Sequence, residues 1–268
     1  MNYRHIYHAG NFADVFKHGL LCVLLASLTK KDKPLTYLET HAGCGFYDLK
    51  TLAANKTREY EKGIVKLLSL SDQPDALKPY LELVKSFNSE CGFRFYPGSP
   101  LVAAKLLREN DKMILCELHP EDVNYLKLSL KQHTSVKAAV HHCDGYHGLK
   151  AFTPPTPRRG LVLIDPPFEK PSEINDLISG LKMGLSRWPN ATYVVWYPIK
   201  NNGQQDVLLK KIDALKTPYI NQRLVVDCDK SSTRLIGSGM VVINPPFGSE
   251  ETIKIVTQYL STVFTSHS

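Results

Sequence analysis

Short apolar runs alternate along the chain with longer segments of helical periodicity. Branched and aliphatic residues occupy consecutive positions of the apolar runs, as is typical of strands buried on both faces of a parallel sheet. The pattern predicts seven strands, at residues 35–40, 113–118, 136–142, 161–165, 192–198, 221–227 and 238–244. It predicts helices at residues 11–28, 56–70, 74–88, 99–109, 120–131, 172–187, 204–216 and 250–264. This alternation predicts one α/β sheet of seven mostly parallel strands with helices on both faces.

One connection is too long for a simple crossover. Between Thr40 and Met113 lie 72 residues, where a crossover needs about a dozen. Residues 50–95 carry two of the predicted helices and account for the excess. We therefore expect a single domain, residues 1–268, with a small helical insertion at 50–95 on the ligand-binding edge of the sheet.

Composition limits the class of protein. Hydrophobic residues make up 43% of the chain and charged residues 22%, which is ordinary for a globular protein. The sequence has no run of 18 apolar residues, so no membrane span is expected. The polar, His-rich N-terminus lacks the apolar core of a signal peptide. Six cysteines are scattered without a Cys-x-x-Cys pair, which favours reduced thiols over disulfides or a zinc site. We therefore expect a cytoplasmic protein.

The chain is basic. Its net charge is +7 and its isoelectric point is about 9.0, which favours an anionic partner, most commonly nucleic acid. Charge alone does not identify that partner, because many basic enzymes bind nothing longer than a cofactor.

The ends of the first two strands along the chain carry candidate ligand-binding residues. In an open parallel sheet, ligands bind beyond the carboxyl ends of the strands. The first strand is followed by Gly43 and Gly45, which allow a tight turn and close approach of the backbone to a ligand. The second ends at Glu117, an acid placed to hold the two hydroxyls of a ribose.

The next two strand ends complete the pattern. Asp144 and Gly145 follow the third strand, where the aspartate could face an adenine amine. The fourth strand is followed by DPPF, residues 165–168. Acids and glycines are common at strand ends because turns need them, so each feature alone is weak. Their order on four consecutive strands predicts a Rossmann-like class I methyltransferase that uses S-adenosylmethionine.

A second phrase, NPPF at residues 244–247, nearly repeats DPPF. It follows the seventh strand, which is usually antiparallel in a sheet of this kind, so its end should point away from the site. We expect DPPF to carry the chemistry and NPPF to form a turn into the last helix.

The DPPF residues suit methylation of an exocyclic purine amine. The lone pair of such an amine is delocalised into the ring, and hydrogen bonds to the Asp165 carboxylate and the Pro166 carbonyl would localise it. Catalysis would then depend on positioning and electrostatics. Phe168 would stack on the target base, worth roughly 1–3 kcal/mol, once that base has been turned out of its helix.

Several longer motifs resemble one family. They are YRHIYHAGNFADVFKH (3–18), YLETHAGCGFY (37–47), YPGSP (96–100), ELHP (117–120), DGY (144–146) and LIDPPFE (163–169). Together they resemble the RlmJ family of bacterial 23S ribosomal RNA adenine-N6 methyltransferases, from the N-terminus to NPPF. Two positions depart from the family pattern: Glu39 stands where Asp is common, and Phe168 where Tyr is common.

The resemblance implies roles for particular residues. It implies cofactor contacts from His18, His41, Ser99, Glu117, Asp144 and Gly145. It implies that Asp165 is catalytic and that Tyr3 contacts the RNA or its target base. It also implies that 23S RNA is methylated before the subunit is fully assembled.

Basic residues near these motifs are candidates for phosphate contacts, which give affinity without specifying sequence. We expect such contacts from Arg4 and Lys17. Arg158 and Arg159 are weaker candidates because they precede the catalytic strand and should lie at its opposite end.

A metal site is not expected. Adjacent residues of a strand point to opposite faces, so His141 and His142 cannot easily share one ion. The partner motifs of a zinc deaminase are missing from the sequence.

Four other functions remain as alternatives. A DNA adenine-N6 methyltransferase shares the DPPF chemistry, but it usually has an added target-recognition region. Methylation of a protein glutamine normally uses Asn in place of Asp165. A non-catalytic RNA-binding module would be expected to lose Asp165 or Glu117. A nicotinamide dehydrogenase would need the dinucleotide glycine spacing. We expect a monomer, because no long exposed apolar stripe is evident.

Overall fold

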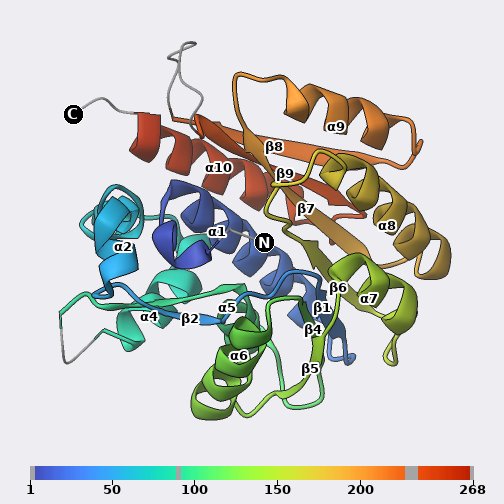
Figure 1. The fold of residues 1–268 in the computed structure, drawn as a ribbon, viewed down its shortest axis with the longest axis horizontal. Coiled ribbons are helices and arrows are strands. Elements are labelled where there is room, and N and C mark those ends of the chain that lie inside the picture. Colours follow the sequence, from blue (N-terminus) through green and yellow to red (C-terminus); the bar gives the residue numbers. More distant parts are fainter. Residues whose placement is uncertain (1–3, 89–91, 227–234, 266–268) are drawn as a thin grey trace.

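The computed structural model describes residues 4–88, 92–226 and 235–265 (Figure 1). Its strands are β1 (Thr36–Glu39), β2 (Phe46–Asp48), β3 (Phe95–Pro97), β4 (Lys112–Glu117), β5 (Lys137–His142), β6 (Gly160–Ile164), β7 (Thr192–Ile199), β8 (Tyr219–Val225) and β9 (Gly237–Ile243). Its α-helices are α1 (Phe12–Thr29), α2 (Leu52–Thr57), α3 (Lys66–Leu68), α4 (Lys78–Ser86), α5 (Ser99–Leu106), α6 (Pro120–His133), α7 (Gly145–Phe152), α8 (Glu173–Arg187), α9 (Gln204–Asp213) and α10 (Glu250–Thr265). Short turns of other helix types are η1 (His5–Tyr7), η2 (Glu61–Val65) and η3 (Asp75–Leu77).

Seven strands form the main sheet, in the order β5-β4-β1-β6-β7-β9-β8. The strands from β5 to β7 pair in parallel, and β9 pairs antiparallel with both β7 and β8. This confirms the predicted seven-stranded, mostly parallel sheet. The chain order reverses between β1 and β6, and ligands bind at such switch points in open α/β sheets.

Helices cover both faces of the sheet (Figure 1). Side chains of a strand alternate between faces, so Leu161 and Leu163 of β6 enter one core with α1, α5, α6 and α10. Val162 and Ile164 enter the second core, with α7, α8 and α9. Two buried cores hold the sheet between them, so the strand ends are placed by rigid packing.

Helix α1 lies at the centre of the first core. Asn11 caps its N-terminus by accepting a hydrogen bond from the Asp14 N–H at 2.9 Å. By length and composition alone α1 could cross a membrane, yet 78% of it is buried inside the protein. It packs against α5 and α10, so its apolar character is that of a core helix.

The predicted insertion is more broken than its periodicity suggested. The helix expected at 56–70 is divided into α2, the π-helical η2 and α3, and the one expected at 74–88 into η3 and α4. An unpredicted two-stranded ribbon, β2 with β3, joins the two ends of this segment. A Cβ on Gly63 would lie 2.1 Å from the Gly10 carbonyl oxygen. That close approach holds the segment against the N-terminal residues, and we infer that it is a subdomain inserted into the methyltransferase fold.

Helix α7 was not predicted. It is eight residues long and contains Gly145 and Gly148, both poor helix formers. It forms because the Asp144 carboxylate caps its first turn and because the helix packs on α8. A Cβ on Gly145 would lie 2.1 Å from the Thr40 carbonyl oxygen, so glycine lets this loop approach the end of β1.

Candidate active site

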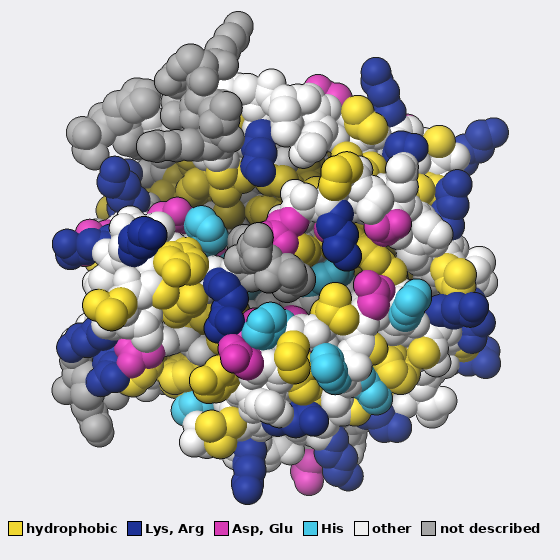
Figure 2. Space-filling view, in the orientation of Figure 1, with side chains coloured by type: hydrophobic (Ala, Val, Ile, Leu, Met, Phe, Trp, Pro, Cys, Tyr) yellow, Lys and Arg dark blue, Asp and Glu magenta, His cyan; other side chains and the backbone are white. Residues whose placement is uncertain are grey.

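A cavity of about 1860 Å³ opens at the carboxyl ends of β1, β4, β5 and β6. In Figure 2, histidine, acidic and basic side chains gather near the centre of the face shown. The predicted residues that line it are His18, His41, Gly43, Ser99, Glu117, Asp144, Gly145, Asp165, Pro166 and Lys17. Tertiary packing therefore brings residues from distant parts of the sequence to one cavity.

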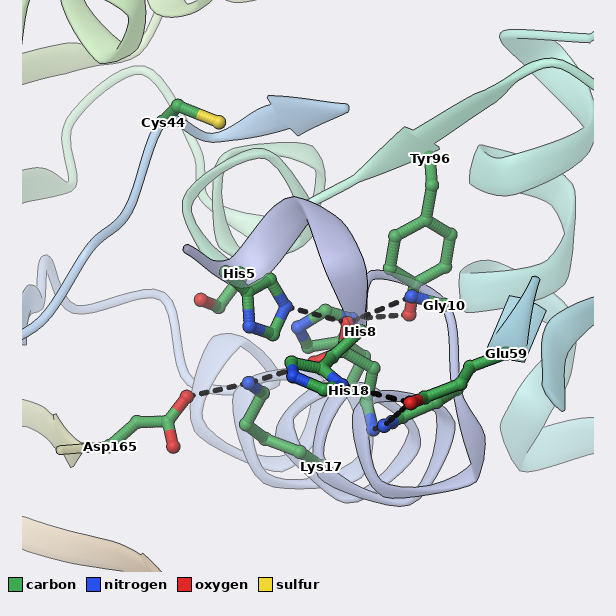
Figure 3. A network of polar contacts seen from close by, with 12 residues as sticks. His5, His8, Gly10, Lys17, His18, Cys44, Glu59, Tyr96 and Asp165 are labelled. Atoms are coloured by element: carbon green, nitrogen blue, oxygen red, sulfur yellow. Dashed lines mark hydrogen bonds and ion pairs between the residues drawn. The ribbon is translucent and has the colours of Figure 1, made fainter. Parts of the chain in front are cut away.

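Asp165, directly after β6, is held by a lysine from α1 (Figure 3). The Lys17 ammonium donates to Asp165 Oδ2 at 2.6 Å and lies 2.9 Å from Asp14 Oδ1. The Lys17 side chain is only 5% exposed. Burial opposes its charge, but the Asp14 and Asp165 carboxylates outweigh burial and raise the pKa of Lys17. The lysine thus remains an ammonium and fixes one oxygen of Asp165.

The same network continues to the N-terminal segment (Figure 3). Asp14 Oδ2 accepts the Gly10 N–H at 2.9 Å and lies 2.8 Å from His5 Nε2. Burial alone would raise the pKa of Asp14, but His5 and Lys17 lower it well below its usual range. Asp14 and His5 were not predicted as site residues from the sequence. The signal was present, since Asp14, Lys17 and His18 are polar residues in a helix that is otherwise apolar.

This placement corrects the expectation for Lys17. A phosphate contact needs an exposed cation, whereas this ammonium is buried between two carboxylates. Its charge is already compensated, so the geometry links it to Asp165 rather than to an RNA backbone.

Phe168 is placed differently from the expected stacking platform. It has a left-handed backbone conformation, with φ at 52°. Its ring packs on the second core and meets the Trp196 ring edge-on, with the centroids 5.9 Å apart. It is not among the residues that line the cavity, whereas Trp196 is. Stacking of Phe168 on the target base stays a prediction, and it requires the ring to leave this position.

Glu117 ends β4 and organises the first glycine turn. Its Oε2 accepts the Gly43 N–H at 2.8 Å, and its Oε1 accepts the His119 N–H at 2.7 Å. Gly43 has φ at 60°, a conformation that favours glycine. Burial raises the pKa of Glu117. Each carboxylate oxygen can still accept another hydrogen bond, so the acid can hold the turn and a ribose together.

Asp144 has a structural partner for one oxygen. Its Oδ1 accepts the Tyr146 N–H at 2.9 Å and the His147 N–H at 3.1 Å, which caps α7. Among the described residues, its Oδ2 has no hydrogen-bond partner. One oxygen therefore positions the loop while the other is available to an adenine amine.

Two histidines line the cavity in neutral form. Burial lowers the pKa of His18 to about 3 and that of His41 to about 4. His41 Nδ1 lies 2.7 Å from the Thr40 hydroxyl. His18 is 1% exposed, and its Nε2 is buried without a hydrogen-bond partner among the described residues. An unpaired buried N–H or nitrogen is costly, so this atom indicates a missing ligand.

Ser99 begins α5 and is tied to a buried carboxyl group. Its hydroxyl is hydrogen-bonded to Glu39 Oε1, and the Tyr37 hydroxyl lies 2.8 Å from Glu39 Oε2. Burial raises the pKa of Glu39 to about 8, against the opposing effect of both hydroxyl groups. Glu39 is fully buried and does not line the cavity. It therefore supports Ser99 from behind rather than facing a ligand.

The other predicted RNA contacts are dispersed. Tyr3 lies outside the described residues. Arg4 is exposed and pairs with Glu121 of α6 at 3.2 Å. Arg159 donates to the Lys33 carbonyl at 2.8 Å, at the start of β6. The arginine therefore lies at the sheet edge opposite Asp165, as its position in the sequence had suggested.

The mouth of the cavity carries a set of cations that sequence analysis did not select. They are Lys62, Lys66, Lys150, Lys170 and Lys200, and none has a salt bridge within the part of the chain that the structure describes. They come from four separate segments, so no local charge run marks them.

No group of three or more potential metal ligands occurs among the described residues. His141 packs against the Phe152 ring, with the centroids 4.1 Å apart, and His142 Nε2 lies 3.0 Å from the Leu118 carbonyl. The two adjacent histidines therefore have different surroundings.

Fold and site together define a class of protein. The strand order, the acid at the end of β4, the Asp-Gly after β5 and the DPPF after β6 are those of a Rossmann-like, S-adenosylmethionine-dependent methyltransferase. The unpartnered His18 Nε2 and Asp144 Oδ2 fit a ligand with both donors and acceptors. Such a cofactor would be held by the residues around the carboxyl ends of β1, β4 and β5.

Comparison with known proteins gives the family. Residues 32–268 match the family described as "Ribosomal RNA large subunit methyltransferase D, RlmJ", and the chain belongs to it. This confirms the resemblance inferred from the motifs. The chain is 41% identical over 261 residues to "Ribosomal RNA large subunit methyltransferase J" of Escherichia coli, covering 97% of this chain and 92% of that protein.

Two further relatives are similar to nearly the whole chain. The protein of the same name from Haemophilus influenzae is 38% identical over 264 residues, covering 97% of this chain and 93% of that protein. A crystal structure of a Legionella pneumophila protein has a TM-score of 0.90 and 38% identity, covering 97% of this chain and 96% of that one. The similarity therefore extends over nearly the whole chain in both sequence and fold.

Proposed function

We propose that this protein transfers a methyl group from S-adenosylmethionine to the exocyclic N6 of an adenine in 23S ribosomal RNA. It acts on free or partly assembled RNA. The names of the curated relatives support the ribosomal RNA substrate. The observation that carries the proposal is the Asp165 carboxylate, held by Lys17 at the wall of the cavity that also contains Glu117 and His18.

The cofactor-binding residues divide by position. Asp144 and Gly145 would hold the adenine of the cofactor, Glu117 would hold its ribose, and His18 and Ser99 would hold its amino-acid end. When bound there, S-adenosylmethionine supplies an electrophilic methyl group on a sulfonium. His18, Ser99 and Glu117 are buried, and hydrogen bonds from such positions are stronger than those in water.

Asp165 acts on the target amine. Lys17 holds its Oδ2, so Oδ1 is available to accept a hydrogen bond from N6, together with the Pro166 carbonyl. These acceptors localise the nitrogen lone pair for in-line attack. Methyl transfer would form the N–CH₃ bond as the S–CH₃ bond breaks, with S-adenosylhomocysteine as the leaving group. The proton lost from nitrogen would pass to Asp165 and then to water. Positioning and electrostatics supply the rate enhancement.

The lysines at the cavity mouth hold the RNA. Lys62 and Lys66 lie on the inserted segment, and Lys150, Lys170 and Lys200 lie on the sheet side. Together they suit phosphates on both sides of a base turned into the cavity. Binding through several phosphates weakens as salt rises. Ribosomal RNA is made in the cytoplasm, and the protein is expected to work there as a monomer.

The test uses tritiated S-adenosylmethionine with protein-free 23S RNA from a strain that lacks the enzyme. Wild type and Asp165→Ala are compared, and the RNA is digested to nucleosides. We expect labelled N6-methyladenosine from wild type and none from Asp165→Ala, with cofactor binding retained.

Other outcomes distinguish the alternatives. Label in double-stranded DNA, with none in RNA, would identify a DNA adenine methyltransferase. RNA binding without transfer to any substrate would indicate a non-catalytic binding module. Equal transfer by wild type and Asp165→Ala would overturn the role of the carboxylate.

A further inference from the structure

A chain of hydrogen bonds connects the inserted segment to His18. His18 Nδ1 lies 2.8 Å from the Tyr96 hydroxyl, which lies 2.9 Å from the Tyr80 hydroxyl (Figure 3 shows the first pair). Tyr80 belongs to α4 and Tyr96 to β3, and both are fully buried. The His18 ring is stacked on Tyr96, with the centroids 5.6 Å apart and the planes at 25°. The histidine is therefore fixed in orientation by residues of the insertion.

The donors and acceptors along these hydrogen bonds indicate where the protons lie. Among the described residues, Tyr96 is the only hydrogen-bond partner of Tyr80. A buried O–H without an acceptor costs free energy, so Tyr80 donates to Tyr96. The Tyr96 hydroxyl then donates to His18 Nδ1, which is the remaining acceptor in this series of hydrogen bonds. A neutral imidazole carries one proton, so the proton of His18 is on Nε2.

The direction of this chain gives His18 a defined role at the cavity. Its Nε2 lacks a protein partner and its side chain lines the cavity. In this tautomer the atom can only donate a hydrogen bond, so it requires an acceptor on the ligand. Burial keeps the imidazole neutral by lowering its pKa to about 3.

The ligand acceptor follows from the layout of the site. Glu117 ends β4, Asp144 lies just after β5, and Asp165 follows β6. Adenosine held at β4 and β5 with its sulfonium toward Asp165 leaves its amino-acid end near β1, α1 and α5. That end carries one anionic acceptor, a carboxylate. His18 on α1, which packs against α5, is placed to meet it.

We propose that Tyr96, supported by Tyr80, is a positioning residue that holds His18 as a donor to the carboxylate of the cofactor's amino-acid end. This proposal rests on the proposed use of S-adenosylmethionine. It gives the insertion a role in cofactor recognition, because both tyrosines lie in or beside it.

The test compares two ligands by calorimetry on the full chain. S-adenosylhomocysteine has the amino-acid end, and 5′-methylthioadenosine lacks it. Tyr96→Phe should weaken S-adenosylhomocysteine binding about tenfold and leave methylthioadenosine unchanged. Tyr80→Phe should have a smaller effect in the same direction, because Tyr96 can still donate to His18. Tyr193→Phe is the matched control, since that buried hydroxyl donates to the Trp188 carbonyl outside the cavity.

A second measurement observes the tautomer directly. Long-range ¹⁵N–¹H correlation spectra of the histidine-labelled protein should show His18 protonated on Nε2 in wild type, and mixed tautomers in Tyr96→Phe. Three results would each overturn the proposal. Tyr96→Phe could lose affinity equally for both ligands, or its affinity for S-adenosylhomocysteine could be unchanged. In wild type, the proton of His18 could be found on Nδ1. If wild type bound no S-adenosylhomocysteine and methylated no RNA, the proposed function itself would fail. If wild type bound S-adenosylhomocysteine tightly and Tyr96→Phe bound it equally well, only the positioning role of Tyr96 would be refuted.

Discussion

DPPF and NPPF differ by one atom type in their first side chain. They nevertheless leave the sheet in opposite directions, DPPF beyond the carboxyl ends of the parallel strands and NPPF beyond their amino ends. DPPF follows β6, whose Ile164 is paired with Val195 in parallel β7. NPPF follows β9, whose Ile243 is paired with Tyr193 near the start of β7, because β9 is antiparallel. The direction of the strand therefore decides which phrase reaches the cavity.

The first residue of each phrase has a different task. Asp165 accepts a hydrogen bond from the buried ammonium of Lys17. Asn244 donates two, to the carbonyl groups of Pro189 at 2.8 Å and Ala191 at 3.0 Å. An acid accepts from a cation, and an amide joins two carbonyl groups. The residue at each edge matches the polarity of its neighbours.

The two phenylalanines differ as well. Phe168 packs on Trp196 and the second core. Phe247 is fully exposed, and the turn that holds it leads into α10, as predicted for NPPF. Similar sequences thus form a site at one edge and a surface turn at the other.

The largest effect should follow Lys17→Met, which removes the buried cation that pairs with Asp165 of DPPF. Asp14 and Asp165 would lose their shared partner, and such uncompensated burial costs about 3–5 kcal/mol. Urea unfolding followed by circular dichroism measures this loss. Lys62→Met, at the exposed mouth, is the control and should leave the free energy of unfolding nearly unchanged. A loss under about 1 kcal/mol for Lys17→Met would contradict the buried network.

Asp165→Asn makes the active phrase read NPPF. It keeps the shape but places an amide against the Lys17 ammonium, and the acceptor for the target amine is weakened. We expect kcat for RNA methylation to fall about 10²–10³-fold, with S-adenosylhomocysteine affinity within a few-fold of wild type. Single-turnover methyl transfer measures the loss. Full activity in this variant would show that the two phrases are chemically interchangeable.

The edge that carries Asp165 should also respond to pH through Glu39 on neighbouring β1, whereas the Asn244 contacts do not titrate. Burial raises the pKa of Glu39 from its ordinary 4.5 to about 8. The buried site favours the neutral carboxyl group, so Glu39 contributes fully to the free energy of unfolding below pH 4.5. That contribution is lost as pH rises to about 8. Glu39→Gln stays neutral, so the melting temperature of wild type should fall relative to this variant across that range. A constant difference from pH 5 to 8 would argue against a raised pKa.

Asn244→Asp makes the inactive phrase read DPPF and should have the smallest effect. It replaces two N–H donors by a carboxylate facing two carbonyl groups, at a cost of about 1–3 kcal/mol of stability. Methyl transfer by the folded variant should be unchanged. Phe247→Ser in the same turn is the control, expected within about 0.5 kcal/mol of wild type. Loss of methyl transfer in folded Asn244→Asp would mean that NPPF takes part in the chemistry.

Much of this architecture could be predicted from the sequence. The seven strands and the helices from α8 to α10 follow from periodicity, because buried strands and amphipathic helices impose different spacings. The position of DPPF after the fourth strand of the main sheet distinguishes it from NPPF in the sequence alone. Motif resemblance added residues such as His18 and Ser99, for which local pattern gave no reason.

Other features depended on contacts between distant residues. Helix α7 has a weak local signal and forms through its cap and its packing on α8. The β2–β3 ribbon pairs residues about fifty positions apart.

What the sequence determined by itself was the order of strands and the chemical types placed at their ends. Only the tertiary structure decided that Lys17 meets Asp165, that Glu39 stands behind Ser99, and that Phe168 packs on Trp196. The physical reason is that charge compensation and burial depend on partners brought together across the fold. A local sequence pattern records which side chains are present, and packing decides which of them meet.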